Sequence, residues 1–120
     1  MDKYQALQSF WSGFGLKAYD ETSVPDNSTL PYITYESSGD SFDNTLFLSA
    51  SLWCRNTSWT ALIGVERTIS DAIGRGGKLV KYEGGAFWIR RGHPWMHRMD
   101  DPEDDSIRRI ILNVIIEFID

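Results

Sequence analysis

The chain has 120 residues, of which 42% are hydrophobic and 13% aromatic, so it can bury a core without disulfides or metal ions. Its formal net charge of −5 argues against binding to nucleic acid or to anionic membranes through overall charge. No run of about 18 apolar residues could form a transmembrane helix, and the first residues lack the pattern of a signal peptide. We therefore expect a soluble intracellular protein with one domain, residues 1–120, and no membrane partner.

A short amphipathic helix is predicted at the start of the chain, over residues 2–14. Large apolar residues recur there at helical spacing, and Asp2 and Gln5 have the spacing of a capping box. Gly13 is expected to end this helix. Residues 20–31 are rich in Asp, Ser, Thr, Asn and Pro, which predicts an irregular surface loop.

Two strands and a second helix are predicted in the middle of the chain. Residues 32–36 are aromatic and β-branched, and residues 45–53 alternate between apolar and mixed positions, which together indicate a β-hairpin. Apolar residues then recur at helical spacing over residues 59–73. Ser58 is the best N-cap for this helix, and Gly74 is expected as its left-handed C-cap.

The last third of the chain predicts more sheet. Residues 78–82 and 86–90 flank Glu83-Gly84-Gly85 and indicate a second hairpin. A loop is expected over residues 91–99. The final segment, 107–119, fits both a helical and an alternating pattern, but its many β-branched residues favour a strand. We expect this strand to be long and central and to be buried on both faces over part of its length.

These elements predict an α+β fold in one domain, a mostly antiparallel sheet of about four to six strands with two helices packed against it. The chain has one cysteine, Cys54, so an intrachain disulfide is impossible. This cysteine ends an apolar strand and has no base beside it in the sequence. A small buried core residue is therefore favoured over a reactive thiol.

The most unusual segment mixes basic and aromatic residues within an acidic chain. Such a mixture can bind phosphates and stack on bases, and it is also typical of protein interfaces, where Trp, Met and Arg are enriched. The acidic net charge favours the interface. Asp40 and Asp43, in the first hairpin loop, form a second candidate contact. The candidate interface residues of the basic segment are Arg90, Arg91, His93, Trp95, His97 and Arg98.

Metal binding and catalysis have weaker support. His93 and His97 lie near several aspartates of residues 100–104, but their spacing matches no zinc motif, and a solvated loop with internal salt bridges is favoured. Asp40 and Asp43 have no adjacent base that would make them a catalytic pair. No nucleophile elbow, Cys–His pair or nucleotide fingerprint occurs in the sequence. We therefore expect a protein that is not an enzyme and that uses no cofactor.

The order of several short segments resembles small structural proteins encoded in the head–tail gene region of long-tailed phages and prophages of Gram-positive bacteria. Among these, the chain is similar to the tail terminator, or tail completion, proteins. The resemblance extends from about Lys3 to Phe118, and its most specific parts are the proline-tyrosine entry to the first strand and residues 74–109. The segments that carry the resemblance are Ala18-Tyr19-Asp20-Glu21, Val24-Pro25, Leu30-Pro31-Tyr32-Ile33-Thr34-Tyr35, Trp53, Thr57-Ser58-Trp59, Ile73-Gly74-Arg75-Gly76-Gly77, Gly85-Ala86-Phe87-Trp88-Ile89-Arg90-Arg91-Gly92 and Asp105-Ser106-Ile107-Arg108-Arg109-Ile110.

The resemblance implies an α/β fold and a geometric role without an active site. Six copies would form a ring that caps the tail tube and joins the tail to the head. The implied partners are other copies of the chain, the tail tube protein and a neck or head-completion protein, and sequence-specific nucleic acid is not among them. The implied locations are the virion and, during assembly, the host cytoplasm.

Two alternatives remain open within this group of proteins and beyond it. The insertion over residues 88–105 is longer than in some terminator families, which leaves a neck, head-completion or minor capsid component as an alternative. A metal-binding or nucleic-acid-binding small domain is an alternative of another class. A ring would need two different contact patches on each copy. The basic segment could supply one patch, and the acidic run 100–105 or the loop with Asp40 and Asp43 could supply the other.

Overall fold

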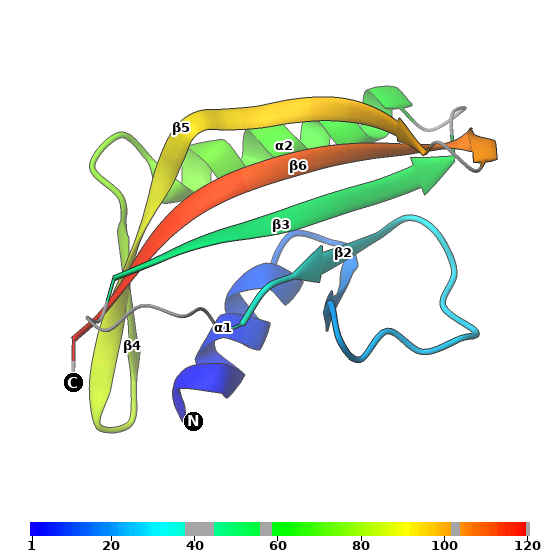
Figure 1. The fold of residues 1–120 in the computed structure, drawn as a ribbon. Helices are drawn as coiled ribbons and strands as arrows, with labels where there is room; N and C mark the ends of the chain where they lie inside the picture. Colours follow the sequence, from blue (N-terminus) through cyan, green and yellow to red (C-terminus); the bar gives the residue numbers. More distant parts are fainter. Residues whose placement is uncertain (38–44, 56–58, 102–103, 120) are drawn as a thin grey trace.

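The computed structural model describes residues 1–37, 45–55, 59–101 and 104–119. Within these residues the chain forms two helices and six strands (Figure 1). The elements, in chain order, are α1 (Lys3–Ser12), β1 (Lys17–Asp20), β2 (Tyr32–Tyr35), β3 (Thr45–Arg55), α2 (Trp59–Ile73), β4 (Lys78–Tyr82), β5 (Gly85–Asp101) and β6 (Asp104–Ile119).

All six strands belong to one sheet, with the order β1-β2-β3-β6-β5-β4. Four of its five strand pairs are antiparallel, and β1 with β2 is the parallel pair, so the sheet is mixed. The predicted fold of two helices against a mostly antiparallel sheet is therefore confirmed. Strand β1 was not predicted, because its four residues are too few to show an alternating pattern and it gains its hydrogen bonds from β2.

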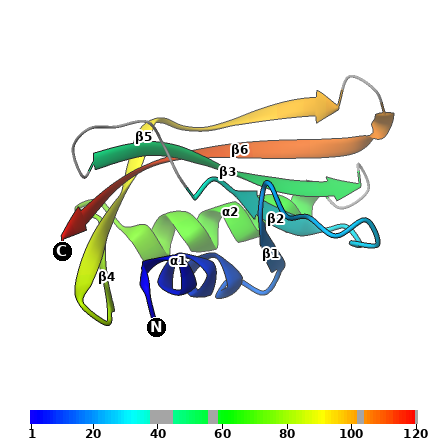
Figure 2. The same ribbon diagram turned by 60° about the horizontal axis from the view of Figure 1, so that its bottom comes forward.

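Both helices pack on the same face of the sheet, which curves around α1 (Figure 2). The capping box of α1 is confirmed, because the Asp2 side chain accepts from the Gln5 amide and the Gln5 side chain accepts from the Asp2 amide, both at 2.9 Å. Gly74 ends α2 with a φ of 74°, the left-handed conformation expected of a C-cap. Ser58, the predicted N-cap, lies outside the described residues.

Strand β6 lies at the centre of the sheet, between β3 and β5, as predicted. Its side chains alternate: Ile110, Leu112, Val114 and Ile116 are buried under the helices. The alternate residues Ile111, Asn113 and Ile115 are only half-buried. The prediction that this strand is buried on both faces was therefore wrong, since both helices cover the same face.

The core lies between this helix-covered face and the two helices. Cys54 is fully buried there, as predicted, and burial raises the pKa of its thiol, an effect that the nearby Arg108 partly opposes. The largest fully buried side chains are Trp11, Phe87, Leu7, Ile33, Leu52, Leu62, Ile69, Ile73, Ile89, Ile110, Leu112 and Ile116.

The segment 91–99 was predicted as a loop, and this prediction was wrong, because β5 continues through it to Asp101. Glycine and proline usually interrupt strands, and Pro94 lacks an amide donor. The pairing of β5 with β6 shifts between Arg91 and Met96, so a bulge accommodates the missing donor. The Asn113 side-chain amide donates to the Pro94 carbonyl at 3.0 Å and restores one contact across this irregularity.

Asp20, the last residue of β1, joins this strand to the end of β2. Its carboxylate accepts from the Thr22 amide at 3.0 Å, from the Thr22 hydroxyl at 2.7 Å and from the Ser37 hydroxyl. These hydrogen bonds, led by that from Ser37, lower the pKa of Asp20. Because hydrogen bonds favour the charged form, Asp20 stabilises the fold when it is ionised.

We therefore predict a pH-dependent effect of Asp20→Asn. A lowered pKa in the folded state adds stability above the unfolded pKa of about 3.9, and this stability is lost as the pH falls through the folded pKa. The free energy of unfolding of the variant should be lower than that of the native protein at pH 7, and the two should converge below about pH 3. Urea denaturation from pH 2.5 to 7 measures this. A difference that stays constant over this range would contradict the prediction.

Candidate functional site

The second face of the sheet is not covered by either helix (Figure 2). The odd-numbered residues of β3 and β6 point to it, opposite the buried even-numbered residues. It carries large apolar side chains that are open to solvent, since Phe47 is 78% exposed and Met99 is 44% exposed. Phe47 lies beside Ile115 and Met99 lies beside Arg109, so each is a separate candidate point of contact with other molecules on this face. We refer to it as the open face.

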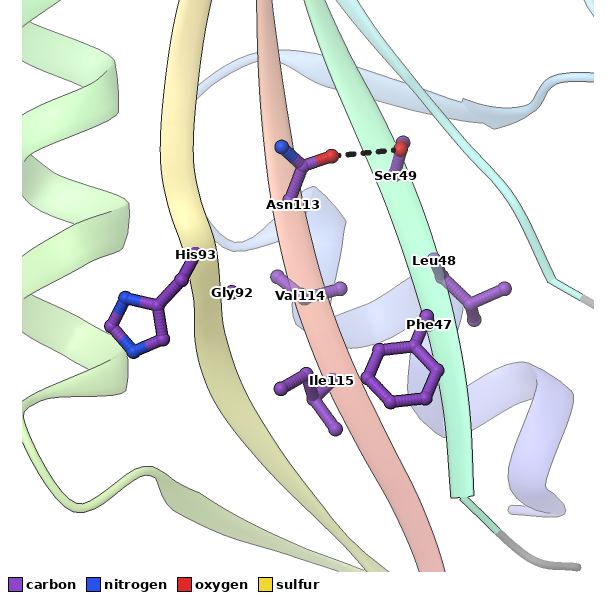
Figure 3. Close-up of a pocket in the computed structure, with 8 residues that line it drawn as sticks. All are labelled: Phe47, Leu48, Ser49, Gly92, His93, Asn113, Val114 and Ile115. Atoms are coloured by element: carbon purple, nitrogen blue, oxygen red, sulfur yellow. Dashed lines mark hydrogen bonds between the residues drawn. The ribbon is translucent and has the colours of Figure 1, made fainter.

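A groove with a volume of about 520 Å³ crosses the open face where β3, β6 and β5 lie side by side (Figure 3). The Phe47 ring and Ile115 lie next to each other on one side of it. At its floor, the Ser49 hydroxyl donates to the Asn113 side-chain oxygen at 3.1 Å. The residues that line the groove are Phe47, Leu48, Ser49, Gly92, His93, Asn113, Val114 and Ile115.

Gly92 forms part of this floor because it has no side chain. A Cβ at this position would lie 2.9 Å from the Asn113 carbonyl oxygen and 3.0 Å from the Asn113 Cβ. Any other residue would therefore push β5 away from β6. The glycine lets the two strands approach closely beside the bulge and leaves the groove open above them.

A second cluster of the open face surrounds Trp53. The Arg109 guanidinium lies over the Trp53 ring, 4.6 Å from its centroid, and the Arg109 Nε donates to the Ser51 hydroxyl at 3.0 Å. The Trp53 indole donates to the Thr34 hydroxyl at 2.9 Å. This cluster therefore connects β2, β3 and β6 on the open face.

A shallow pocket of about 470 Å³ lies beside Trp53. It is formed by the end of the loop before β2 together with the adjoining ends of β3 and β6. Its walls combine aromatic, hydroxyl and guanidinium groups, a composition common at protein interfaces. The residues that line it are Ser28, Thr29, Leu30, Tyr32, Trp53, Arg55 and Ile107.

The structure divides the predicted basic segment between the two faces of the sheet. The Arg91 guanidinium donates to the Ser70 hydroxyl of α2 at 2.9 Å, and the Trp95 indole donates to the Glu66 carboxylate at 2.7 Å. Glu66 is only 8% exposed, so this hydrogen bond satisfies a buried carboxylate. Arg91 and Trp95 therefore contact α2 of their own chain.

The other predicted interface residues of the segment are exposed. Arg90 pairs with Ile115 and His97 pairs with Ile111, which places both on the open face, whereas Arg98 pairs with the buried Ile110. His93 projects from β5 at the edge of the groove (Figure 3). The interface role of these residues stays a prediction. Asp40 and Asp43 lie outside the described residues.

Three further features bear on possible functions of other classes. In the part of the chain that the structure describes, no three metal-ligating side chains converge on one point. The described helices include none that is long and apolar enough to cross a membrane. The basic side chains of β5 do not form one continuous surface, because Arg91 turns to α2 and Arg90 to the open face.

The Trp53–Arg109 cluster was not predicted from the sequence. The alternation of β3 does place Phe47, Ser49, Ser51 and Trp53 together on one face, and two large aromatics on a face with serines signal a surface of this kind. The partner of Trp53 is set by the register between β3 and β6, in which Trp53 pairs with Arg109. That register is not visible in either segment alone.

No protein-family model and no curated protein matches the chain. A search of solved structures finds a chain of the structure described as "Virion of native gene transfer agent (GTA) particle". The similarity covers 98% of the present chain and 91% of that chain, with a TM-score of 0.63 and 18% sequence identity. The two chains therefore share one fold over almost their whole lengths.

Proposed function

We propose that the chain is a non-enzymatic structural protein of a phage-like virion. The observation that carries this proposal is the fold shared with a virion chain of a gene transfer agent particle, which extends over 98% of the present chain. The resemblance of the sequence to phage head–tail proteins supports the same conclusion independently. The exposed apolar side chains of the open face are candidates for the contacts that an assembled protein makes.

Within the virion, the role that the sequence resemblance supports is that of a tail terminator. Several copies, six by the resemblance, form a ring that caps the tail tube and joins the tail to the head. The partners are then other copies of this chain, the tail tube protein and a neck or head-completion protein. The protein acts in the virion and is assembled in the cytoplasm of the bacterial host.

The test is electron microscopy of the tail tube protein from the same genome, polymerised with and without this chain. Tubes that stop at a controlled length and carry a ring at one end would support the terminator role. Tubes that grow without limit would contradict it and would favour a neck, head-completion or minor capsid component.

Phe47 provides a variant that separates assembly from folding. Because its side chain is 78% exposed, Phe47→Ala should change the free energy of unfolding by no more than about 0.5 kcal/mol. If the open face contacts other proteins of the particle, the same variant should lose control of tube length. Tyr4→Ala is the matched control, since this side chain is 58% exposed on α1, away from the open face. Equal activity of both variants would contradict a role of the open face.

A further inference from the structure

Arg109 is held in a fixed orientation on the open face. Its Nε donates to Ser51, and its guanidinium rests on the Trp53 ring, which is itself fixed by the hydrogen bond from its indole to Thr34. Arginine side chains normally lose much conformational freedom when they bind a partner. Here that freedom is already lost in the folded chain, so binding at the two terminal nitrogens would cost little entropy.

No ion pair satisfies this arginine within the part of the chain that the structure describes. Glu21 is the acid whose charge it influences. Burial and the neighbouring charges of Glu36 and Asp20 raise the pKa of Glu21, while Arg109 opposes this rise. Among the residues that the structure describes, Glu21 forms no ion pair with Arg109 and the Arg109 hydrogen bond uses Nε, so the terminal nitrogens have no acceptor there.

The surroundings of Arg109 favour a protein partner. Trp53 lies beneath it, Met99 pairs with it across β5 and β6, and the pocket beside Trp53 adds Tyr32 and Arg55. Tryptophan, tyrosine, methionine and arginine are the residues most enriched at the centres of protein interfaces. An apolar side chain next to an acidic residue would fit this pocket and the arginine together.

The charges of the chain favour a single carboxylate over a nucleic-acid backbone. A guanidinium fork binds both carboxylates and phosphates in a bidentate way. A nucleic acid, however, brings many phosphates, and these would be repelled by Asp20, Glu21 and Glu36 near the site and by the net charge of −5. A lone acidic side chain would meet less of this repulsion.

We propose that Arg109 binds the carboxylate of an acidic segment of a partner protein, with Trp53 and the neighbouring pocket taking up the apolar residues beside that carboxylate. This inference rests on the proposed function in one respect, since it takes the partner to be another protein of the same particle. It assigns to the Trp53–Arg109 cluster a recognition role rather than a purely structural one.

The experiment uses a short, terminally blocked peptide, Leu-Glu-Leu, as the probe and follows the Arg109 Nε–H and Trp53 Nε1–H signals by NMR at low salt. The native chain should show saturable shifts of both signals. Arg109→Gln should weaken binding by about fivefold or more, and Arg109→Lys by about two- to threefold, because lysine keeps the charge and lacks the planar fork. Arg67→Gln is the matched control, since this arginine is exposed on α2, and it should bind like the native chain.

Glu21→Gln tests the same site in the opposite direction. Removal of this negative charge should strengthen binding of the Leu-Glu-Leu peptide by about twofold, since like charges near a binding site oppose association. A loss of folding in Arg109→Gln does not affect this variant, which leaves the Trp53–Arg109 contacts in place. A merely structural arginine predicts no gain of affinity here.

The inference would be overturned by any of three results. These are no binding by the native chain, equal binding by native and Arg109→Gln chains, or stronger binding of a single-stranded oligothymidylate than of the Leu-Glu-Leu peptide. The tube experiment above decides the proposed function separately. If the chain controls tube length but does not bind the peptide, only the present inference is contradicted. If it binds the peptide but does not affect tube length, only the terminator role is contradicted.

Discussion

Trp11→Ala should be among the most destabilising single substitutions in the chain, with a loss of about 3–5 kcal/mol. Trp11 is 1% exposed, and its ring stacks on the Tyr35 ring at 6.4 Å and meets the Phe10 ring edge-on at 5.0 Å. Truncation removes this contact area and leaves a cavity between α1 and the sheet. The neighbouring side chains cannot fill it, because Tyr35 is held by a hydrogen bond to Gln8.

Thermal unfolding monitored by circular dichroism measures this loss. For a chain of this size, the expected decrease in free energy corresponds to a midpoint lower by roughly 10–20 °C. Tyr4→Ala is the control, since Tyr4 lies on the same helix and is 58% exposed, and its midpoint should remain within about 2 °C of the native value. A small effect of Trp11→Ala would mean that α1 contributes little to the core.

The elements that the sequence predicted well are those whose signals are local. The alternation of β3 and β6 and the capping box of α1 each depend on neighbours within a few residues. Gly74 likewise marks the end of α2 through its own backbone conformation. Such patterns are readable because the hydrogen bonds or burial that they reflect arise within one segment.

The elements that the sequence did not predict depend on distant partners. Strand β1 has four residues and exists because β2 pairs with it. Strand β5 passes through Gly92 and Pro94 because Asn113 of β6 approaches the glycine closely and donates to the proline carbonyl. In both cases the local sequence does not indicate a strand. Pairing with a strand from elsewhere in the sequence determines the structure.

The same distinction explains the candidate site. The predicted basic segment is continuous in the sequence, but its residues alternate between two faces because the stretch is a strand. Trp95 and Arg91 therefore bind α2, while Arg90 and His97 reach the open face. The open face itself follows from the position of both helices on one side of the sheet. That arrangement is a property of the tertiary fold, which no single segment contains.

Gly77→Ala should be the second strongly destabilising substitution, although it adds only one methyl group. Gly77 has a φ of 93°, where a residue with a Cβ is strained, and an added Cβ would lie 2.7 Å from the Ile89 carbonyl oxygen. The same Cβ would also lie 2.7 Å from the Arg90 Cγ and from the Trp88 Nε1. The backbone oxygen cannot move without separating β4 from β5, because Ile89 pairs with Lys78.

The expected loss for Gly77→Ala is at least about 2 kcal/mol, from roughly 1–2 kcal/mol for the backbone conformation and roughly 1–3 kcal/mol for overpacking. Gly76→Ala is a control at the adjacent position, since an added Cβ there meets nothing within 4 Å. Its stability should equal or slightly exceed that of the native chain, because alanine reduces the entropy of the unfolded state. Urea denaturation of both variants measures these changes in the free energy of unfolding. If the two substitutions had equal effects on the free energy of unfolding, the connection between α2 and β4 would be sensitive to substitution in general. The close approach of Gly77 to β5 would then not explain the loss of stability.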